Sequence, residues 1–176
     1  MSLAQLIGRE TGTRLAGRAP LTVAAARVGA LGNQVPEGAS IDTCHDRITF
    51  TTPAVSLVVE AVPHSDPDMT FRIAGLVDPT VIVPFDARVT VEFINADTDQ
   101  AHGWLITAAQ PPFAFRPRTP PALAGASAAV IGDPTPAGQG ALTLSFTAST
   151  AGTYHYICPM PGHAEMGMYG SFIVWP

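Results

Sequence analysis

The feature that most constrains the fold of this chain is a period-two alternation of apolar and polar residues, in short runs from about residue 48 onward. The run 141–148 (ALTLSFTA) alternates Leu and Phe with Thr and Ser, and the run 88–95 (RVTVEFIN) repeats the pattern. Successive side chains of a β-strand point to opposite faces of the sheet. Each run therefore predicts a strand with one buried face.

Six further runs are rich in β-branched or aromatic residues and are bounded by Pro, Gly or Asp. They cover residues 54–62, 69–74, 80–85, 102–107, 153–158 and 170–175. Short strands separated by turn residues, with no helical pattern between them, predict an all-β antiparallel sandwich or barrel. The apolar fraction of 47% is large enough for its core. The longest interruption, about 108–140, is rich in Pro, Ala and Gly and predicts a surface loop.

The N-terminal part of the chain lacks this alternation. Apolar residues near helical spacing predict a short helix over residues 3–18, followed by a loosely ordered connection. We therefore expect two parts, a helical or irregular extension over 1–47 and a domain over 48–176 on which it packs.

Charge and hydropathy exclude several classes of function. The net charge is −5, and the nine basic residues are all Arg and are scattered, so no basic stripe is available to bind nucleic acid. There is no stretch of about 20 apolar residues of the kind that forms a transmembrane helix. The first residues, MSLAQLIGRE, lack the basic, apolar and small-residue regions of a signal peptide, so we expect none in this chain.

The most informative segment for function is 153–176, TYHYICPMPGHAEMGMYGSFIVWP. It predicts a strand that ends at Cys158, a tight loop containing Pro and Gly, and a final strand. Cys158, His163 and Met168 follow the spacing C-x4-H-x4-M. Thiolate, imidazole and thioether together indicate copper, because mononuclear blue sites use two His, one Cys and a weak axial Met.

The second His of such a site must come from another strand. His102 stands at the beginning of a predicted strand, from which it can enter the same end of a sandwich as the Cys158 loop. His155 alternates away from Cys158 and points to the other face of its strand. His45 and His64 lie in predicted loops, so His102 is the candidate.

Two questions stay open at the level of these residues. The axial sulfur could belong to Met160, Met166 or Met168. Cys158 could also pair with Cys44, since two cysteines can form one disulfide in an oxidising compartment. The protein would then be a β-sandwich binding module without a metal.

Other copper functions need features that this chain lacks. A multicopper oxidase or nitrite reductase needs further His ligands, commonly in H-x-H or H-C-H arrangements, and neither occurs here. A copper chaperone usually exposes a Met-rich or C-x-x-C surface, and there is no C-x-x-C pair. The pattern favours one mixed site that passes electrons.

Residues 80–107 and 142–175 resemble the rusticyanins, a family of cupredoxins. The resemblance rests on RVTVEFIN, on the following HGWLIT segment and on AGTYHYICPMPGHAEMGMYGSFIV. It implies an all-β, cupredoxin-like Greek-key sandwich or barrel with a short N-terminal helical extension. It also implies four metal ligands, namely His102, Cys158, His163 and Met168.

The resemblance further implies a mononuclear type 1 copper protein that is not an enzyme. One copper ion would cycle between Cu(I) and Cu(II) in a monomer that shuttles single electrons between respiratory partners, such as a c-type cytochrome or an oxidase. The implied location is the periplasm, or elsewhere outside the cytoplasm. Gly103 departs from the family, in which a Ser after the first His supports the copper site. We expect its hydrogen bond to be lost or replaced by a backbone group.

Overall fold

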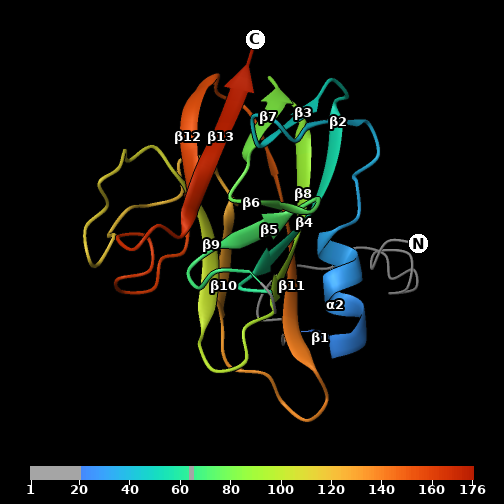
Figure 1. Ribbon diagram of the computed structural model, residues 1–176. Coiled ribbons are helices and arrows are strands. Elements are labelled where there is room, and N and C mark those ends of the chain that lie inside the picture. Colours follow the sequence, from blue (N-terminus) through green and yellow to red (C-terminus); the bar gives the residue numbers. More distant parts are fainter. Residues whose placement is uncertain (1–20, 64–65) are drawn as a thin grey trace, which may run out of the picture.

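The computed structural model describes residues 21–63 and 66–176, which form two β-sheets packed face to face (Figure 1). The first sheet has the strand order β1 (Leu21–Val23), β11 (Gln139–Thr147), β8 (Arg88–Asn95), β4 (Ala54–Ala61), β5 (Phe71–Ile73) and β6 (Leu76–Val77). The second has the order β10 (Ser127–Ile131), β9 (His102–Thr107), β12 (Gly152–Ile157), β13 (Tyr169–Trp175), β7 (Thr80–Pro84), β3 (Arg47–Phe50) and β2 (Ala39–Asp42). The predicted all-β sandwich is confirmed.

The eight strands predicted from alternation and composition are all present, with ends within two residues of the predicted ones. The purely antiparallel arrangement is wrong in detail, because β4 pairs with β8 in parallel, and β7 pairs in parallel with both β3 and β13. Connections that cross from one sheet to the other bring strands distant in sequence side by side. Local periodicity does not contain this information.

Two predicted irregular regions contain regular structure. The interruption at 108–140 includes β10, an Ala-rich strand that pairs with β9. The expected connection up to residue 47 contains β1, helix α2 (Ala25–Gly32) and β2. These strands are short, and β1 forms only where β11 pairs with it, so their sequences carry little local signal. The predicted helix at 3–18 lies outside the described residues, and the division at residue 47 stays a prediction.

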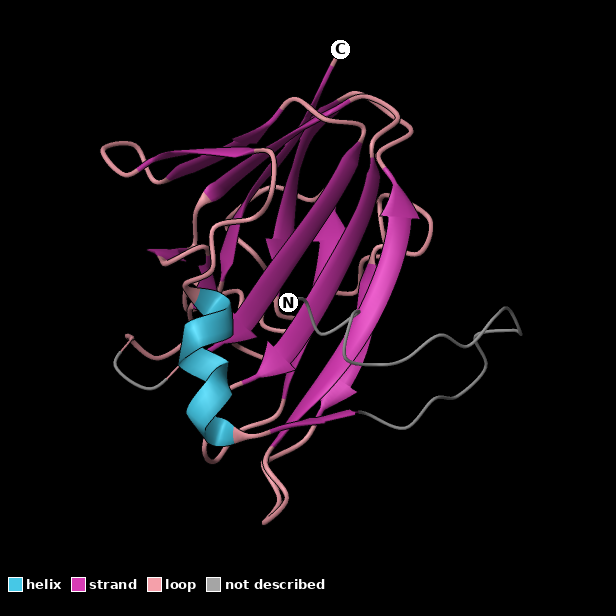
Figure 2. Cartoon of the chain, turned by 90° about the vertical axis from the view of Figure 1, so that its right-hand side faces the viewer, coloured by secondary structure: helices cyan, strands magenta, loops and turns pink. Residues whose placement is uncertain are grey.

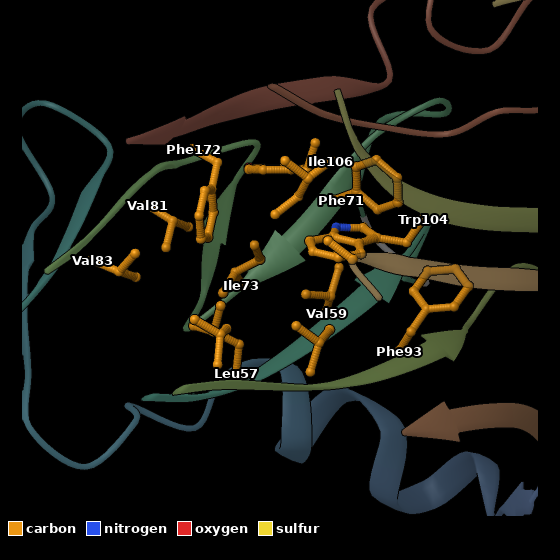
Figure 3. Close-up of a cluster of buried hydrophobic side chains, with 14 of the residues drawn as sticks. Leu57, Val59, Phe71, Ile73, Val81, Val83, Phe93, Trp104, Ile106 and Phe172 are labelled. Carbon is orange, nitrogen blue, oxygen red and sulfur yellow. The ribbon is translucent and has the colours of Figure 1, made fainter. Parts of the chain in front are cut away.

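The main core fills the space between the two sheets with aliphatic and aromatic side chains from both (Figure 3). Trp104 and Tyr156 lie with their ring centroids 6.3 Å apart, and Phe71 meets Tyr156 edge-on at 5.7 Å. The Tyr156 hydroxyl donates a hydrogen bond to the Pro79 carbonyl at 2.7 Å, which satisfies its one buried polar atom. These rings pack together in the main core, and Tyr156 lies two residues before Cys158.

Helix α2 covers the outer face of the first sheet (Figure 2). Val28 and Leu31 of the helix pack on Ile94 of β8, in a small second core. The helix is short, and none of the described residues forms a helix long and apolar enough to cross a membrane.

A buried carboxylate lies at the C-terminal end of this helix. Glu60 of β4 is fully buried, and one of its oxygens accepts a hydrogen bond from the Gly32 N–H at 3.0 Å. Its other oxygen has no hydrogen-bond partner among the described residues. Burial raises the pKa of Glu60 to about 7, although the Gly32 N–H and the positive charge of Arg72 act in the opposite direction.

We predict that Glu60 makes the fold less stable as the pH rises. Between about pH 4.5 and 7 the folded protein holds a proton on Glu60 that the unfolded chain has already released. The free energy of unfolding therefore falls as the pH rises through this range. Glu60→Gln keeps an oxygen for Gly32 and has no charge to bury. We expect a gain at pH 8 of up to about 3 kcal/mol in the free energy of unfolding, with little change at pH 4.

Urea denaturation at the two pH values measures this difference. Glu37→Gln, the same change at an exposed position, is the control and should alter neither value. Equal effects of the two substitutions would contradict a role for the burial of Glu60.

Candidate metal centre

His102 is the first residue of β9 and is completely buried. Its Nε2 lies 2.8 Å from the Asp97 carboxylate, in the loop that leads from β8 into β9. Asn95, at the end of β8, shapes this loop: its side-chain NH2 donates to the Gln100 carbonyl at 2.8 Å and to two carbonyls at the end of β10. The ring is thus fixed with Nδ1 pointing toward the loop that contains His163.

Cys158 directly follows β12, and its side chain continues the inward alternation of that strand. Tyr154, Tyr156 and Cys158 all belong to the main core. His155 lies on the opposite face between the rings of Phe113 and Tyr169, as the alternation predicted.

The loop from 158 to 168 is closed by hydrogen bonds of its own backbone. Cys158 N–H donates to the Met168 carbonyl at 3.2 Å, and Met168 N–H donates to the His163 carbonyl at 2.9 Å. Gly162 adopts a φ of 86°, which only glycine reaches without strain, and donates to the Phe115 carbonyl at 2.7 Å. The loop therefore lies against the 108–126 segment (Figure 1).

Three potential ligand atoms converge at this end of the sandwich. The Nδ1 atoms of His102 and His163 are 3.2 Å apart, and the Cys158 Sγ lies 3.4 Å from His163 Nδ1 and 3.8 Å from His102 Nδ1. All three residues are buried, and they form the one group of three His, Cys, Asp or Glu side chains within the described ranges with ligand atoms close enough to share a metal. Such a donor set, with one thiolate and two imidazoles, suits copper.

The three methionines that compete for the axial position have different surroundings. Met168 is fully buried in the main core beside Cys158. Met160 is half-buried against that core, whereas Met166 is 62% exposed. The location of Met168 fits the predicted axial ligand, and the exposure of Met166 does not.

Burial changes the pKa of Cys158 and of His163 in the metal-free protein. It raises the pKa of the Cys158 thiol, against backbone hydrogen bonds from Gly103 and Met160 that favour the thiolate. It lowers the pKa of His163, and the neighbouring His102 lowers it further. A metal bound here would displace the thiol proton, and the lowered pKa of His163 favours the neutral ring that can bind a metal.

The alternative disulfide is excluded. Cys44 is exposed and Cys158 is buried, and both are free thiols. His45 pairs with Asp42 on the surface, 2.7 Å away, and His64 lies outside the described residues.

A third, smaller hydrophobic cluster packs against the outer side of the ligand loop. Its members include Ile157, Ala164 and Tyr169, each of which adjoins a predicted ligand in the sequence. Phe113, Leu105 and Ala109 complete the cluster. Phe115 is 55% exposed beside Gly162, so it borders the loop at the surface.

Sequence reasoning missed Asn95 and Asp97. Both are buried polar residues, and they place and orient His102 through their hydrogen bonds. The available signal was a polar N-x-D segment between a strand and its partner, directly before a candidate ligand. Such a segment is also typical of ordinary turns, which is why it did not stand out.

A β-sandwich that gathers a buried Cys, two His and a buried Met at one end defines the cupredoxins, the class of blue copper proteins. A family model described as "Copper binding proteins, plastocyanin/azurin family" matches residues 79–175. The chain belongs to this family of copper-binding proteins, as the sequence resemblance predicted, and copper is its cofactor.

Within this class the chain is similar to rusticyanins. Rusticyanin of Acidithiobacillus ferrooxidans is 36% identical over 129 residues, which are 73% of this chain and 81% of the relative. Rusticyanin of Acidithiobacillus ferridurans is 35% identical over 73% of this chain and 67% of its own length. The solved structure of rusticyanin from Thiobacillus ferrooxidans matches with a TM-score of 0.79 at 30% identity, covering 88% of this chain and 96% of that one.

A side chain at position 103 would fit tightly against its neighbours. A Cβ on Gly103 would lie 3.0 Å from Cγ and 3.1 Å from Cδ of Pro159, and 3.4 Å from a Val130 methyl. The Gly103 N–H also makes a hydrogen bond to the Cys158 sulfur. The supporting hydrogen bond expected at this position is therefore made by the backbone.

We predict that Gly103→Ser destabilises the protein by about 1 to 2 kcal/mol, because the Pro159 ring must move by a few tenths of an ångström to admit the new side chain. Urea unfolding of the metal-free protein measures the loss. Gly132→Ser is the matched control, since a Cβ there meets nothing within 4 Å. A Gly103→Ser variant as stable as this control would show that the Pro159 contact relaxes freely.

Proposed function

We propose that His102, Cys158, His163 and Met168 hold one copper ion, and that the protein carries single electrons by cycling it between Cu(I) and Cu(II). Membership of the plastocyanin/azurin family implies electron transfer in general. The observation that supports the specific proposal is the buried convergence of the two imidazoles and the thiol within 4.8 Å of one another. Copper in such a site supplies a one-electron redox centre.

The surroundings of the ligands favour electron transfer over catalysis. His102, Cys158 and Met168 have no exposed surface, and the main core packs directly against Cys158 and Met168. A catalytic metal site keeps a coordination position open to substrate, as in the comparable zinc enzymes. Here the protein's own side chains occupy the space around the ligands, so we infer that the protein is not an enzyme.

Electrons would enter and leave through His163. It is 7% exposed, while the other three proposed ligands are fully buried, so it is the proposed ligand nearest to solvent. Exposed Pro161, Phe115 and Met166 lie on the loops around it. A small apolar surface of this kind suits weak and transient docking to a redox partner.

The partner class and the location follow from similarity to rusticyanins, and we propose them on that basis. A monomer that passes electrons between respiratory proteins, such as a c-type cytochrome and an oxidase, fits a one-centre carrier. Such a carrier would work in the periplasm or elsewhere outside the cytoplasm.

The visible and EPR spectra after addition of stoichiometric Cu(II) test the proposal. We expect an intense blue absorption and a narrow copper hyperfine pattern, because both arise from a short Cu(II)–thiolate bond. Cys158→Ala should abolish both signals, whereas Cys44→Ala, the control for loss of a thiol, should change neither. A pale spectrum that survives Cys158→Ala would refute thiolate ligation and, with it, the electron-carrier function.

Replacing each methionine in turn tests the axial ligand. We expect Met168→Leu to raise the reduction potential and shift the visible spectrum, because it removes the weak thioether while retaining bulk in the core. Met160→Leu and Met166→Leu are matched controls and should leave the spectrum unchanged. Voltammetry and absorption of the three variants make the comparison. A spectral change confined to Met160→Leu would reassign the axial position.

A further inference from the structure

The Asp97 carboxylate is buried against the outer side of His102. Its Oδ2 lies 2.8 Å from His102 Nε2, and Asp97 is 6% exposed while His102 is not exposed at all. No ligand role was predicted for Asp97, and its distance from the other two convergent side chains keeps it out of the candidate metal group. Its contact is with a proposed ligand.

Asp97 accepts hydrogen bonds from two backbone N–H groups and faces a His102 ring nitrogen, and the carboxyl group of Asp99 lies beside it. Its Oδ1 accepts from the backbone N–H of Thr98 at 2.6 Å and of Asp99 at 3.2 Å, and its Oδ2 faces the His102 ring nitrogen. An amide in this place has one oxygen and one NH2 group, so it can satisfy one side only. The site is therefore built for a carboxylate with acceptors on both sides.

The same hydrogen bond determines which nitrogen of His102 carries the proton. A carboxylate oxygen at 2.8 Å favours a proton on Nε2, which leaves the Nδ1 lone pair free. Nδ1 is the atom that lies 3.2 Å from His163 Nδ1 and 3.8 Å from the Cys158 sulfur. Asp97 thus holds His102 in the tautomer that can bind a metal at the point where the other ligands meet.

Asn95 fixes the position of the Asp97 residue. Asn95 Oδ1 accepts a hydrogen bond from the Asp97 N–H at 3.2 Å, and the Asn95 NH2 group is bound to three carbonyls. A carboxylate held in this way in a buried site cannot turn to solvent to screen its charge. Its field therefore acts on the metal centre through the His102 ring.

We propose that Asp97 is a positioning residue for the copper centre: it fixes the Nε2–H tautomer of His102, and its buried negative charge favours Cu(II) over Cu(I). This inference rests on the proposed role of His102 as a copper ligand. The charge stabilises the more positive oxidation state, so it lowers the reduction potential relative to the same site with a neutral side chain.

The potential is tested with Asp97→Asn, which removes the charge at nearly constant volume. We expect the equilibrium to move toward Cu(I) by about tenfold or more, which corresponds to a rise of about 59 mV for one electron. Asp133→Asn makes the same charge change at an exposed position on the adjoining β10–β11 connection, where solvent screens it. A shift for Asp97→Asn no larger than that of Asp133→Asn overturns the electrostatic part of the proposal.

The tautomer is tested in metal-free protein by nitrogen-15 NMR of the imidazole side chains. We expect His102 of the unaltered protein to be protonated at Nε2 alone, and Asp97→Ala to give a mixture that includes the Nδ1–H form. Asp133→Ala should retain the single tautomer. An unchanged His102 signal in Asp97→Ala overturns the positioning role.

Copper affinity provides a second measurement of the positioning role. Loss of an outer-shell partner of a ligating His typically reduces metal affinity by about 10 to 100-fold, and we expect Asp97→Ala to fall in this range. Circular dichroism of metal-free Asp97→Ala shows whether this variant is folded. If it is unfolded, copper affinity is measured with Asp97→Asn instead. If the unaltered protein shows no blue copper spectrum, the proposed function fails, while the NMR result still decides whether Asp97 sets the His102 tautomer.

Discussion

The metal centre depends on the position of β12 in the interior of the second sheet. β12 pairs on one side with β9 and on the other with β13, both antiparallel, with Ile157 opposite Leu105 and Tyr169. The end of β12 therefore lies beside the beginnings of both neighbours. Cys158 directly follows the end of β12, His102 is the first residue of β9, and Met168 directly precedes β13. The backbone hydrogen bonds between these strands therefore bring three proposed ligands together.

His163 is the one proposed ligand that no strand positions. Its place is determined by the backbone hydrogen bonds within the 158–168 loop and by the packing of Ala164 and Tyr169 in the small outer core. Cys158 and Met168 at the ends of the loop join the main core, and Ala164 between them joins the outer one. A loop held between two cores is rigid, which is the property that electron transfer requires, since ligands that barely move need little reorganisation.

Most of the fold and most of the candidate site could be predicted from the sequence, for a physical reason that also explains the failures. Alternation in 88–95 and 141–148 is a local consequence of the apolar face that each strand turns to the main core, so these strands were predicted with nearly correct ends. β1 and β10 exist because a neighbouring strand pairs with them, and the parallel pairs follow from chain crossings. These are non-local effects that no window of sequence contains.

The same distinction applies to the site. Cys158 and His163 were found because their spacing with Met168 within one segment is itself a chemical pattern. Asp97 was not found, since its role becomes visible only when its distance to His102 is known. Residues that orient a ligand are defined by three-dimensional contacts and leave a weak trace in sequence.

The balance of charge around the centre explains how such a site can be buried at all. A thiolate in the core is costly, and there is no Lys in the chain to neutralise it. The protein instead keeps the metal-free thiol protonated by burial and directs the N–H groups of Gly103 and Met160 at the sulfur. Those dipoles stabilise the thiolate once the proton leaves. Fixed backbone dipoles thus add to the positive charge of the metal that would replace the proton.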